Sequence, residues 1–233
     1  MNFKVIGSSS SGNCYLLEDE GSQILIECGI PWKRVQQALD FKTRGIEFCL
    51  ISHSHGDHAG YVKSVMKAGI DTYMPAEMGV GVSDPIRLSH RFFYLLDSGL
   101  SQLDFAGWHV KAFPVIHDVP CVGFLIARGP WKCLYLSDSM YSPYRFGLGL
   151  THIFLEVNYS LETLAPDLDP IVKKRLLRNH MSLKTAKELL AANDLSSVVE
   201  IWLLHLSSGN SDEEKFRREI QQLTGKPVYI AAA

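Results

Sequence analysis

Residues 50–60 read LISHSHGDHAG and place His53, His55, Asp57 and His58 within one short segment. The apolar run before it, residues 46–52, has the composition of a strand that is buried on both faces. Side chains at the end of such a strand are held by a rigid sheet and can converge on one point. Imidazole and carboxylate groups together are ligands that zinc, manganese and iron accept. The segment therefore predicts a metal site at a strand end.

The composition restricts the classes of function that the chain can have. Its 233 residues are 46% hydrophobic and 21% charged, which is ordinary for a globular protein with a sizeable core. A net charge of −2 gives no overall basic field for nucleic acid. A local basic face is still compatible with that total, and the candidates are residues 173–178 (KKRLLR) and the region around Arg87, Arg91 and Tyr94. The alternative for each is an ordinary solvated or core segment.

Cysteine usage and the N-terminal residues indicate the compartment. The five cysteines form no CxxC pair, which argues against a disulfide framework and favours a reducing compartment. The first residues, MNFKVIGSSSSGNCYLL, resemble neither a signal peptide nor an anchor, and no apolar run approaches the length of a membrane span. We expect a cytoplasmic protein without membrane association.

Periodicity and turn residues predict strand-rich halves, each followed by helices. This order favours an α+β fold with two sheets packed face to face and helices outside, in one domain spanning residues 1–233. Helices are expected at 31–39, 59–69, 168–180, 182–193 and 211–225. Strands are expected at 3–7, 14–19, 22–29, 46–52, 71–75, 91–96, 108–115, 121–127, 132–138, 151–158, 198–206 and 227–231.

Three further candidate ligands, His117, Asp138 and His205, each follow a predicted strand. Taken singly, each is as compatible with a structural role as with a metal site. Together with the first motif they suffice for two ions, which can share a water and lower its pKa toward neutrality. His53, His55 and His117 would bind the first ion. Asp57, His58 and His205 would bind the second, with Asp138 bridging.

Several motifs resemble those of the metallo-β-lactamase fold superfamily, and specifically its YycJ/WalJ-like branch, which is related to the tRNase Z and PhnP phosphodiesterases. The residues that carry the resemblance span nearly the whole chain: GSSSSGNCYLL (7–17), HSHGDH (53–58), HDVPCVGF (117–124), LEVNYS (155–160), KKRLLRNHMS (173–182) and HLSSGNS (205–211). The resemblance implies a four-layer αββα sandwich, two divalent ions, with zinc or manganese expected, and hydrolysis of phosphodiester bonds.

The resemblance also implies roles for particular residues. His180 matches a substrate-facing histidine of related phosphodiesterases, and it could donate to a phosphate oxygen or to the leaving alkoxide. Its alternative is a structural histidine at a helix end. Glu27 stands where the family commonly has aspartate, at a position that supports the metal ligands by hydrogen bonding. Asp57 could also orient the attacking water.

The Gly/Ser-rich loop at residues 7–13 is a candidate substrate contact. Its backbone N–H groups, together with Ser10 and Asn13, could bind a phosphate. An ordinary turn is the equal alternative.

These observations predict a phosphodiesterase that cleaves nucleic acid like an exonuclease, by attack of a metal-bridging hydroxide. The alternative is an enzyme that opens small cyclic nucleotides or cyclic phosphates, as phage proteins of this general fold do against signalling. Such a pocket could be closed by a partner subunit, so a homodimer is a further expectation. A binding module that uses metals only for stability is the non-enzymatic alternative.

Overall fold

The computed structural model describes residues 1–75, 101–147, 149–207 and 209–232. The chain divides into two compact units, unit 1 with Met1–Phe113 and Ala232–Ala233, and unit 2 with Pro114–Ala231. The single domain over residues 1–233 stays a prediction. The strand expected at 91–96 and the basic candidates Arg87 and Arg91 lie outside the described residues. Within the described ranges, no helix has the length and apolar composition needed to cross a lipid bilayer.

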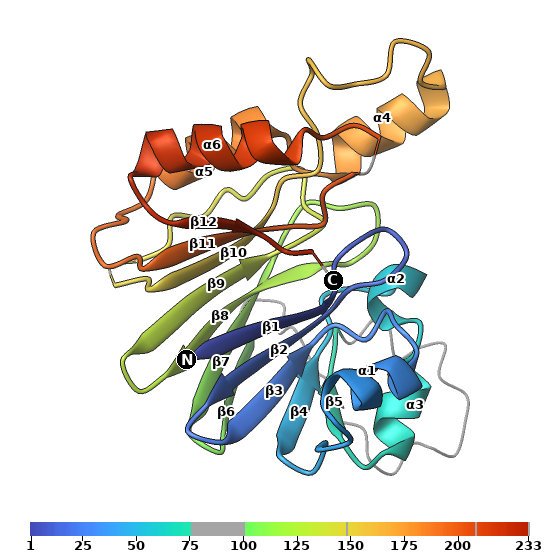
Figure 1. The fold of residues 1–233 in the computed structure, drawn as a ribbon, viewed down its shortest axis with the longest axis vertical. Helices are drawn as coiled ribbons and strands as arrows, with labels where there is room; N and C mark the ends of the chain where they lie inside the picture. Colours follow the sequence, from blue (N-terminus) through green and yellow to red (C-terminus); the bar gives the residue numbers. More distant parts are fainter. Residues whose placement is uncertain (76–100, 148, 208, 233) are drawn as a thin grey trace. The chain divides into compact units, whose positions relative to one another are not determined.

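Unit 1 contains a five-stranded sheet in the order β1-β2-β3-β4-β5. The first two pairs are antiparallel, and β3–β4 and β4–β5 are parallel. Parallel neighbours need a crossover connection, and helices α1 (Trp32–Ala38) and α3 (Val62–Lys67) provide it. Figure 1 shows α3 beside β5. The strand bounds agree with the predicted ranges: β1 (Asn2–Gly7), β2 (Cys14–Asp19), β3 (Ser22–Ile26), β4 (Ile46–Leu50) and β5 (Asp71–Tyr73).

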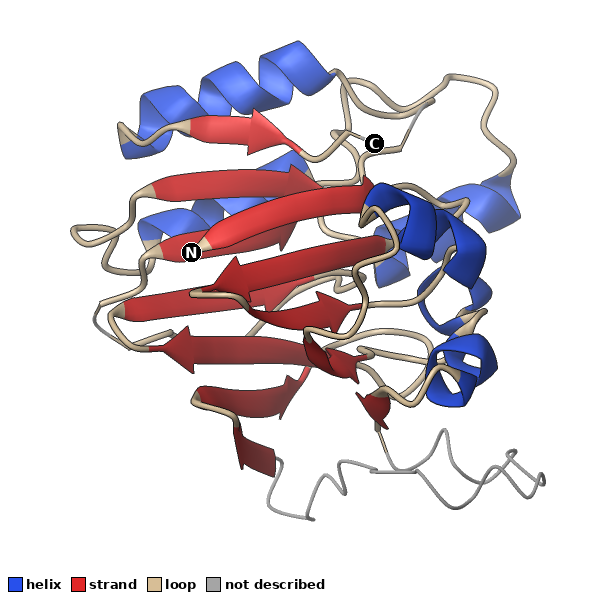
Figure 2. Cartoon of the chain, turned by 60° about the horizontal axis from the view of Figure 1, so that its bottom comes forward, coloured by secondary structure: helices blue, strands red, loops and turns tan. Residues whose placement is uncertain are grey.

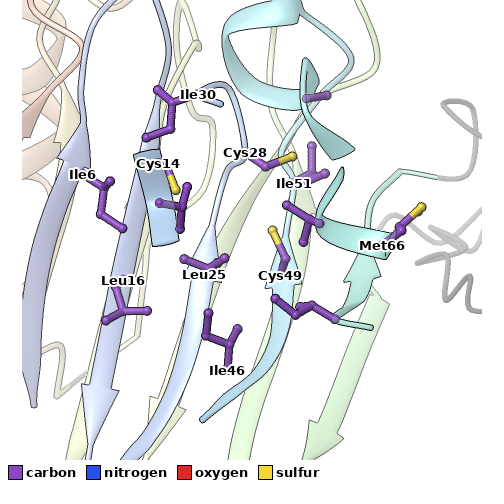
Figure 3. Packing of buried hydrophobic residues seen from close by; sticks show 14 of the residues in the cluster. Ile6, Cys14, Leu16, Leu25, Cys28, Ile30, Ile46, Cys49, Ile51 and Met66 are labelled. Atoms are coloured by element: carbon purple, nitrogen blue, oxygen red, sulfur yellow. The ribbon is translucent and has the colours of Figure 1, made fainter. Parts of the chain in front are cut away.

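The apolar cluster of unit 1 packs the helices against this sheet. Figure 3 shows Leu16, Leu25 and Cys49 on the strands and Met66 on α3, all with their side chains in this cluster. All five cysteines of the chain are free and buried, as the absence of paired spacing predicts. Burial raises the pKa of the Cys14 thiol, so this cysteine behaves as a small apolar side chain.

Two short elements of unit 1 were not predicted. Strand β6 (Ser101–Phe105) pairs antiparallel with β7 (Trp108–Pro114). Helix α2 (Gly56–Ala59) lies where the sequence predicts a loop. This helix is a single turn, in which the carbonyl of His55 accepts from the backbone N–H groups of His58 and Ala59. One turn is too short to show apolar periodicity, which explains why the pattern did not indicate it.

Unit 2 contains five strands in the order β12-β11-β10-β9-β8. Strands β8 and β9 form an antiparallel pair, and β9 through β12 are parallel neighbours. The residues of β10 are all buried, as expected for a parallel strand covered on both faces. The bounds are β8 (Val122–Arg128), β9 (Trp131–Leu136), β10 (His152–Glu156), β11 (Glu200–Leu204) and β12 (Val228–Ile230).

The three helices of unit 2 are α4 (Pro170–Asn179), α5 (Leu183–Ala191) and α6 (Glu213–Thr224). Each begins with a capping side chain, since Asp169, Ser182 and Asp212 accept hydrogen bonds from backbone N–H groups of the first turn. Figure 1 shows α5 and α6 side by side next to the strands and α4 apart from them. Figure 2 shows these helices in blue and the strands in red.

Candidate metal centre

The first motif lies at the end of β4 in unit 1. His53 and His55 follow the strand directly, and Asp57 and His58 belong to the single turn of α2. His53 Nε2 lies 3.0 Å from His55 Nδ1. The rings of His53 and His58 have centroids 4.3 Å apart, and His58 Nε2 lies 3.6 Å from Asp57 Oδ2. The structure thus brings together all four residues that the motif proposed as ligands.

Glu27 supports this group from the neighbouring strand. It follows β3, which runs parallel to β4, and its side chain is fully buried. One carboxylate oxygen lies 3.4 Å from His58 Nδ1, and the other accepts from the backbone N–H of Ser52 at 3.2 Å. The Oγ of Ser52 lies 2.9 Å from Nδ1 of His53. Glutamate in place of the expected aspartate therefore still contacts a candidate ligand.

The predicted substrate-binding residues of the N-terminal loop lie in different environments. Asn13 is fully buried, and its backbone N–H donates to the carbonyl of Asp57 at 2.7 Å. Its side-chain Nδ2 lies 3.1 Å from His58 Nε2. Ser10 is exposed, while Ser9 accepts two of the backbone N–H groups of this loop. Asn13 thus contacts both Asp57 and His58 of the metal-type motif. The substrate-binding roles of Ser10 and Asn13 stay predictions.

Gly29 leaves no space for a side chain beside this motif. A Cβ at Gly29 would lie 1.7 Å from the backbone oxygen of Asp57. We expect Gly29→Ala to displace the Asp57 segment, to cost about 1–3 kcal/mol of stability and to lower the metal content of the purified protein. Urea unfolding and elemental analysis measure the two effects.

The matched control is Gly56→Ala, which lies within the motif itself. A Cβ at Gly56 meets nothing within 4 Å, so this variant should keep the metal content and stability of the wild type. Equal behaviour of the two variants would contradict a specific role for the close approach at Gly29.

A second polar cluster lies in unit 2, at the carboxyl ends of three adjacent parallel strands. Asp138 follows β9, Glu156 ends β10, and His205 follows β11. The pairing places Leu155 opposite Leu136 and Glu156 opposite Leu204. Because the carboxyl ends of parallel strands meet at one edge of a sheet, these side chains lie together. His180, at the C-cap of α4, completes the cluster.

The four side chains of this cluster lie in close contact. His205 Nδ1 lies 2.6 Å from Asp138 Oδ1 and 3.3 Å from Glu156 Oε1. His180 Nδ1 lies 2.6 Å from Glu156 Oε1 and 4.0 Å from Asp138 Oδ2. One ligand atom from each residue lies within 4.8 Å of the others, which is compact enough for one ion. His180 is the most accessible member, with 20% of its side chain exposed.

His117, the remaining predicted ligand, lies close to this cluster within unit 2. The centroids of the His117 and His180 rings are 6.1 Å apart. Its Nε2 lies 3.2 Å from Asp118 Oδ1, and its Nδ1 lies 3.1 Å from the backbone oxygen of Asn179. The structure therefore gathers His117, Asp138, His180 and His205 in one unit. The metal-binding roles of His117, Asp138 and His205 and the substrate-facing role of His180 stay predictions.

Backbone strain accompanies the cluster. Asp138 has φ 46° and His205 has φ 50°, in the left-handed region that few residues other than glycine adopt. Such conformations cost on the order of 1–3 kcal/mol each and persist where the surroundings fix them. The Nδ2 of Asn158 donates to the carbonyl of His205 at 2.9 Å, and Ser137 Oγ donates to Asp138 Oδ1 at 3.1 Å. These bonds help to fix the His205 backbone and the Asp138 side chain.

Glu156 and His180 form an ion pair that controls their protonation. Burial opposes charge on Glu156, but the His180 charge and the hydrogen bonds from His180 and His205 lower the pKa of Glu156. Burial likewise opposes protonation of His180, but the Glu156 charge and hydrogen bond raise the pKa of His180 above its ordinary value. The pair therefore favours an anionic Glu156 and a protonated His180, which can act as a proton donor.

Glu156 is the one member of this cluster that sequence reasoning missed. A signal was present, since Glu156 follows an apolar strand pattern in LEVN, just as Asp138 follows LYLS. The same strand-end pattern that suggested Asp138 therefore also fits Glu156. The LEVN segment contains a single carboxylate among apolar residues. A carboxylate is almost never fully buried unless it is paired.

The donor atoms of both units fit a divalent transition metal. The clusters offer imidazole nitrogens and carboxylate oxygens, which zinc and manganese accept. Histidines of the clusters contact carboxylates or hydroxyls, as metal-binding histidines commonly do. The residues present therefore fit divalent-metal binding, and the number and identity of the ions stay predictions.

Comparison with known proteins finds a matching family model and several relatives. Residues 9–112 match the family model described as "Metallo-beta-lactamase superfamily". The exodeoxyribonuclease WalJ of Streptococcus pneumoniae is 23% identical over 227 residues, covering 91% of this chain and 84% of WalJ.

Two solved structures have a similar fold. The short form of human tRNase Z superposes with a TM-score of 0.63 at 18% identity, over 89% of this chain and 93% of that one. A diphosphatase from the PhnP family superposes with a TM-score of 0.66 at 15% identity, over 98% of this chain and 93% of that one. At these identities the structural likeness establishes the fold alone.

Proposed function

We propose that this chain cleaves phosphodiester bonds of nucleic-acid strands, because residues 9–112 match the metallo-β-lactamase superfamily model. At the coarser level, the chain is a metallohydrolase with nuclease and phosphodiesterase relatives. The resemblance to WalJ extends over most of both chains, which favours a nucleic-acid strand over a small cyclic phosphate. A cytoplasmic location and a homodimer remain expectations from the sequence.

The observation that carries this proposal is the cluster of Asp138, Glu156, His180 and His205 in unit 2. It combines candidate metal ligands with a histidine that is partly exposed and paired with a buried carboxylate. Phosphodiester hydrolysis requires both functions, since negative charge grows on the phosphate while the leaving alkoxide needs a proton.

The candidate metal ligands are those that the sequence indicated: His53, His55, Asp57 and His58 in unit 1, and His117, Asp138 and His205 in unit 2. When bound, divalent ions would neutralise phosphate oxygens and lower the pKa of a water molecule. Glu27 and Asn13 would orient His58 through the contacts described above. Asp57, which is partly exposed, would orient the attacking water.

His180 is proposed as the group that protonates the leaving oxygen. Its side chain is the most accessible of the cluster, and Glu156 holds its Nδ1 at 2.6 Å. This contact leaves Nε2 to donate to the substrate, and it stabilises the protonated form. Glu156 is therefore proposed as a positioning residue that acts through His180.

The test compares three phosphodiester substrates with protein whose metal content has been measured. These are bis-p-nitrophenyl phosphate, 5′-labelled single- and double-stranded DNA, and 3′,5′-cyclic nucleotides, each with added Mn²⁺ or Zn²⁺. We expect metal-dependent shortening of the DNA strands. Opening of cyclic nucleotides without strand shortening would replace the proposed substrate. Hydrolysis of none of them by metal-loaded protein would refute the phosphodiesterase.

A further inference from the structure

Helix α4 is basic and largely exposed. Its sequence, PIVKKRLLRN, contains Lys173, Lys174, Arg175 and Arg178 and no acidic residue. All four basic residues are exposed, and only Leu176 and Asn179 of the helix are buried. With 3.6 residues per turn, Lys174 and Arg178 are one turn apart and lie on the face opposite to these two buried residues. The outward face of α4 is therefore a row of cations.

Most of the cations on this face have no acidic partner within the described part of the chain. Among the described residues, Lys173, Lys174 and Arg178 have no acidic group within 4.0 Å, and Arg175 contacts Asp118 at 3.7 Å. Like charges four residues apart destabilise a helix, so Lys174 and Arg178 oppose helix formation when no anion is present. Ile171, which is 79% exposed, adds an apolar side chain to the same surface.

The C-terminal end of α4 is attached to the candidate metal centre of unit 2. Asn179 Nδ2 donates to Asp118 Oδ2 at 2.6 Å, and Asp118 follows His117 in sequence. The next residue, His180, contacts Glu156. At 1.5 Å per residue, Arg178 and Lys174 lie about 3 and 9 Å along the helix axis from His180. These distances are comparable with the axial rise of about one to three nucleotides of a duplex strand, at about 3.4 Å each.

We propose that the outward face of α4, with Lys174 and Arg178 at its centre, binds the sugar-phosphate backbone of the substrate strand and directs it to His180. This inference rests on the proposed function and specifies its substrate as a polyanionic strand. A small cyclic phosphate carries one negative charge and is too short to contact several of these cations at once. The exposed Ile171 would contact a sugar or base.

The test measures binding separately from hydrolysis. A fluorescent single-stranded DNA with phosphorothioate linkages, which keep the charge and resist cleavage, is titrated with metal-loaded protein at several salt concentrations. The variant is Lys174→Gln with Arg178→Gln. The control is Lys42→Gln with Arg44→Gln, which makes the same charge change on exposed residues before β4, at the strand end remote from His53.

We expect the α4 variant to bind roughly tenfold more weakly at low salt, and the slope of log K against log salt to fall by about 1.4. The control should bind like the wild type, and both variants should hydrolyse bis-p-nitrophenyl phosphate at the wild-type rate. Unchanged DNA binding by the α4 variant, or equal weakening of both variants, would overturn the inference. Wild-type protein that hydrolyses no phosphodiester would refute the proposed function instead, and DNA binding would still decide the role of α4.

Discussion

Asp138→Asn should lower kcat for phosphodiester hydrolysis by about 10³-fold and reduce the metal content of the protein. The Asp138 carboxylate lies 2.6 Å from His205 and 4.0 Å from His180, at the centre of the unit 2 cluster. An amide of the same shape lacks the negative charge that a divalent ion requires from this ligand. The measurements are elemental analysis and the rate with bis-p-nitrophenyl phosphate at saturating Mn²⁺.

The backbone at Asp138 decides which variant makes a clean test. With φ 46°, the position accepts asparagine more readily than alanine, because asparagine is among the few residues that tolerate the left-handed region. The free energy of unfolding of Asp138→Asn should therefore lie within about 1 kcal/mol of that of the metal-free wild type, whereas Asp138→Ala adds backbone strain. A folded Asp138→Asn protein that keeps its metals and more than about a tenth of the activity would contradict the assignment.

His180→Gln should lower kcat on DNA by about 10²–10⁴-fold while the metal content stays at the wild-type level. The reason is that glutamine fills similar space but cannot supply a proton to the leaving alkoxide. The loss should be much smaller with bis-p-nitrophenyl phosphate, whose nitrophenolate leaves without protonation. Equal losses on both substrates, or loss of the metals, would show that His180 is a metal ligand or a structural residue instead.

Glu156→Gln provides an independent readout of the same pair. Glu156 raises the pKa of His180, and activity that requires protonated His180 is lost as pH rises through that pKa. Removing the Glu156 charge should lower the pKa of His180, so the alkaline limb of the kcat profile should move to lower pH. The control is Asp104→Asn, an exposed carboxylate of unit 1, which should leave the profile unchanged. An unmoved limb in Glu156→Gln would contradict the proposed coupling.

Much of the local structure follows from the sequence because strand and helix patterns are local. The apolar runs of residues 14–19 and 46–52 predicted β2 and β4, and the pattern of residues 168–180 predicted α4. The elements that the pattern did not indicate are short. Helix α2 is one turn, and β6 lies directly after the residues outside the described part of the chain.

By itself, the sequence determined the metal-type motif and the order of the later candidate ligands, because each candidate ligand comes soon after a recognisable strand. Only the tertiary structure revealed that Glu156 pairs with His180, that Asn13 holds His58, and that Gly29 abuts the Asp57 backbone. The first two contacts join residues that are 24 and 45 positions apart in the sequence. The third depends on a single close approach between two backbone segments. Sequence periodicity reports which face of an element is buried, whereas the parallel register of neighbouring strands decides which side chains meet at their ends.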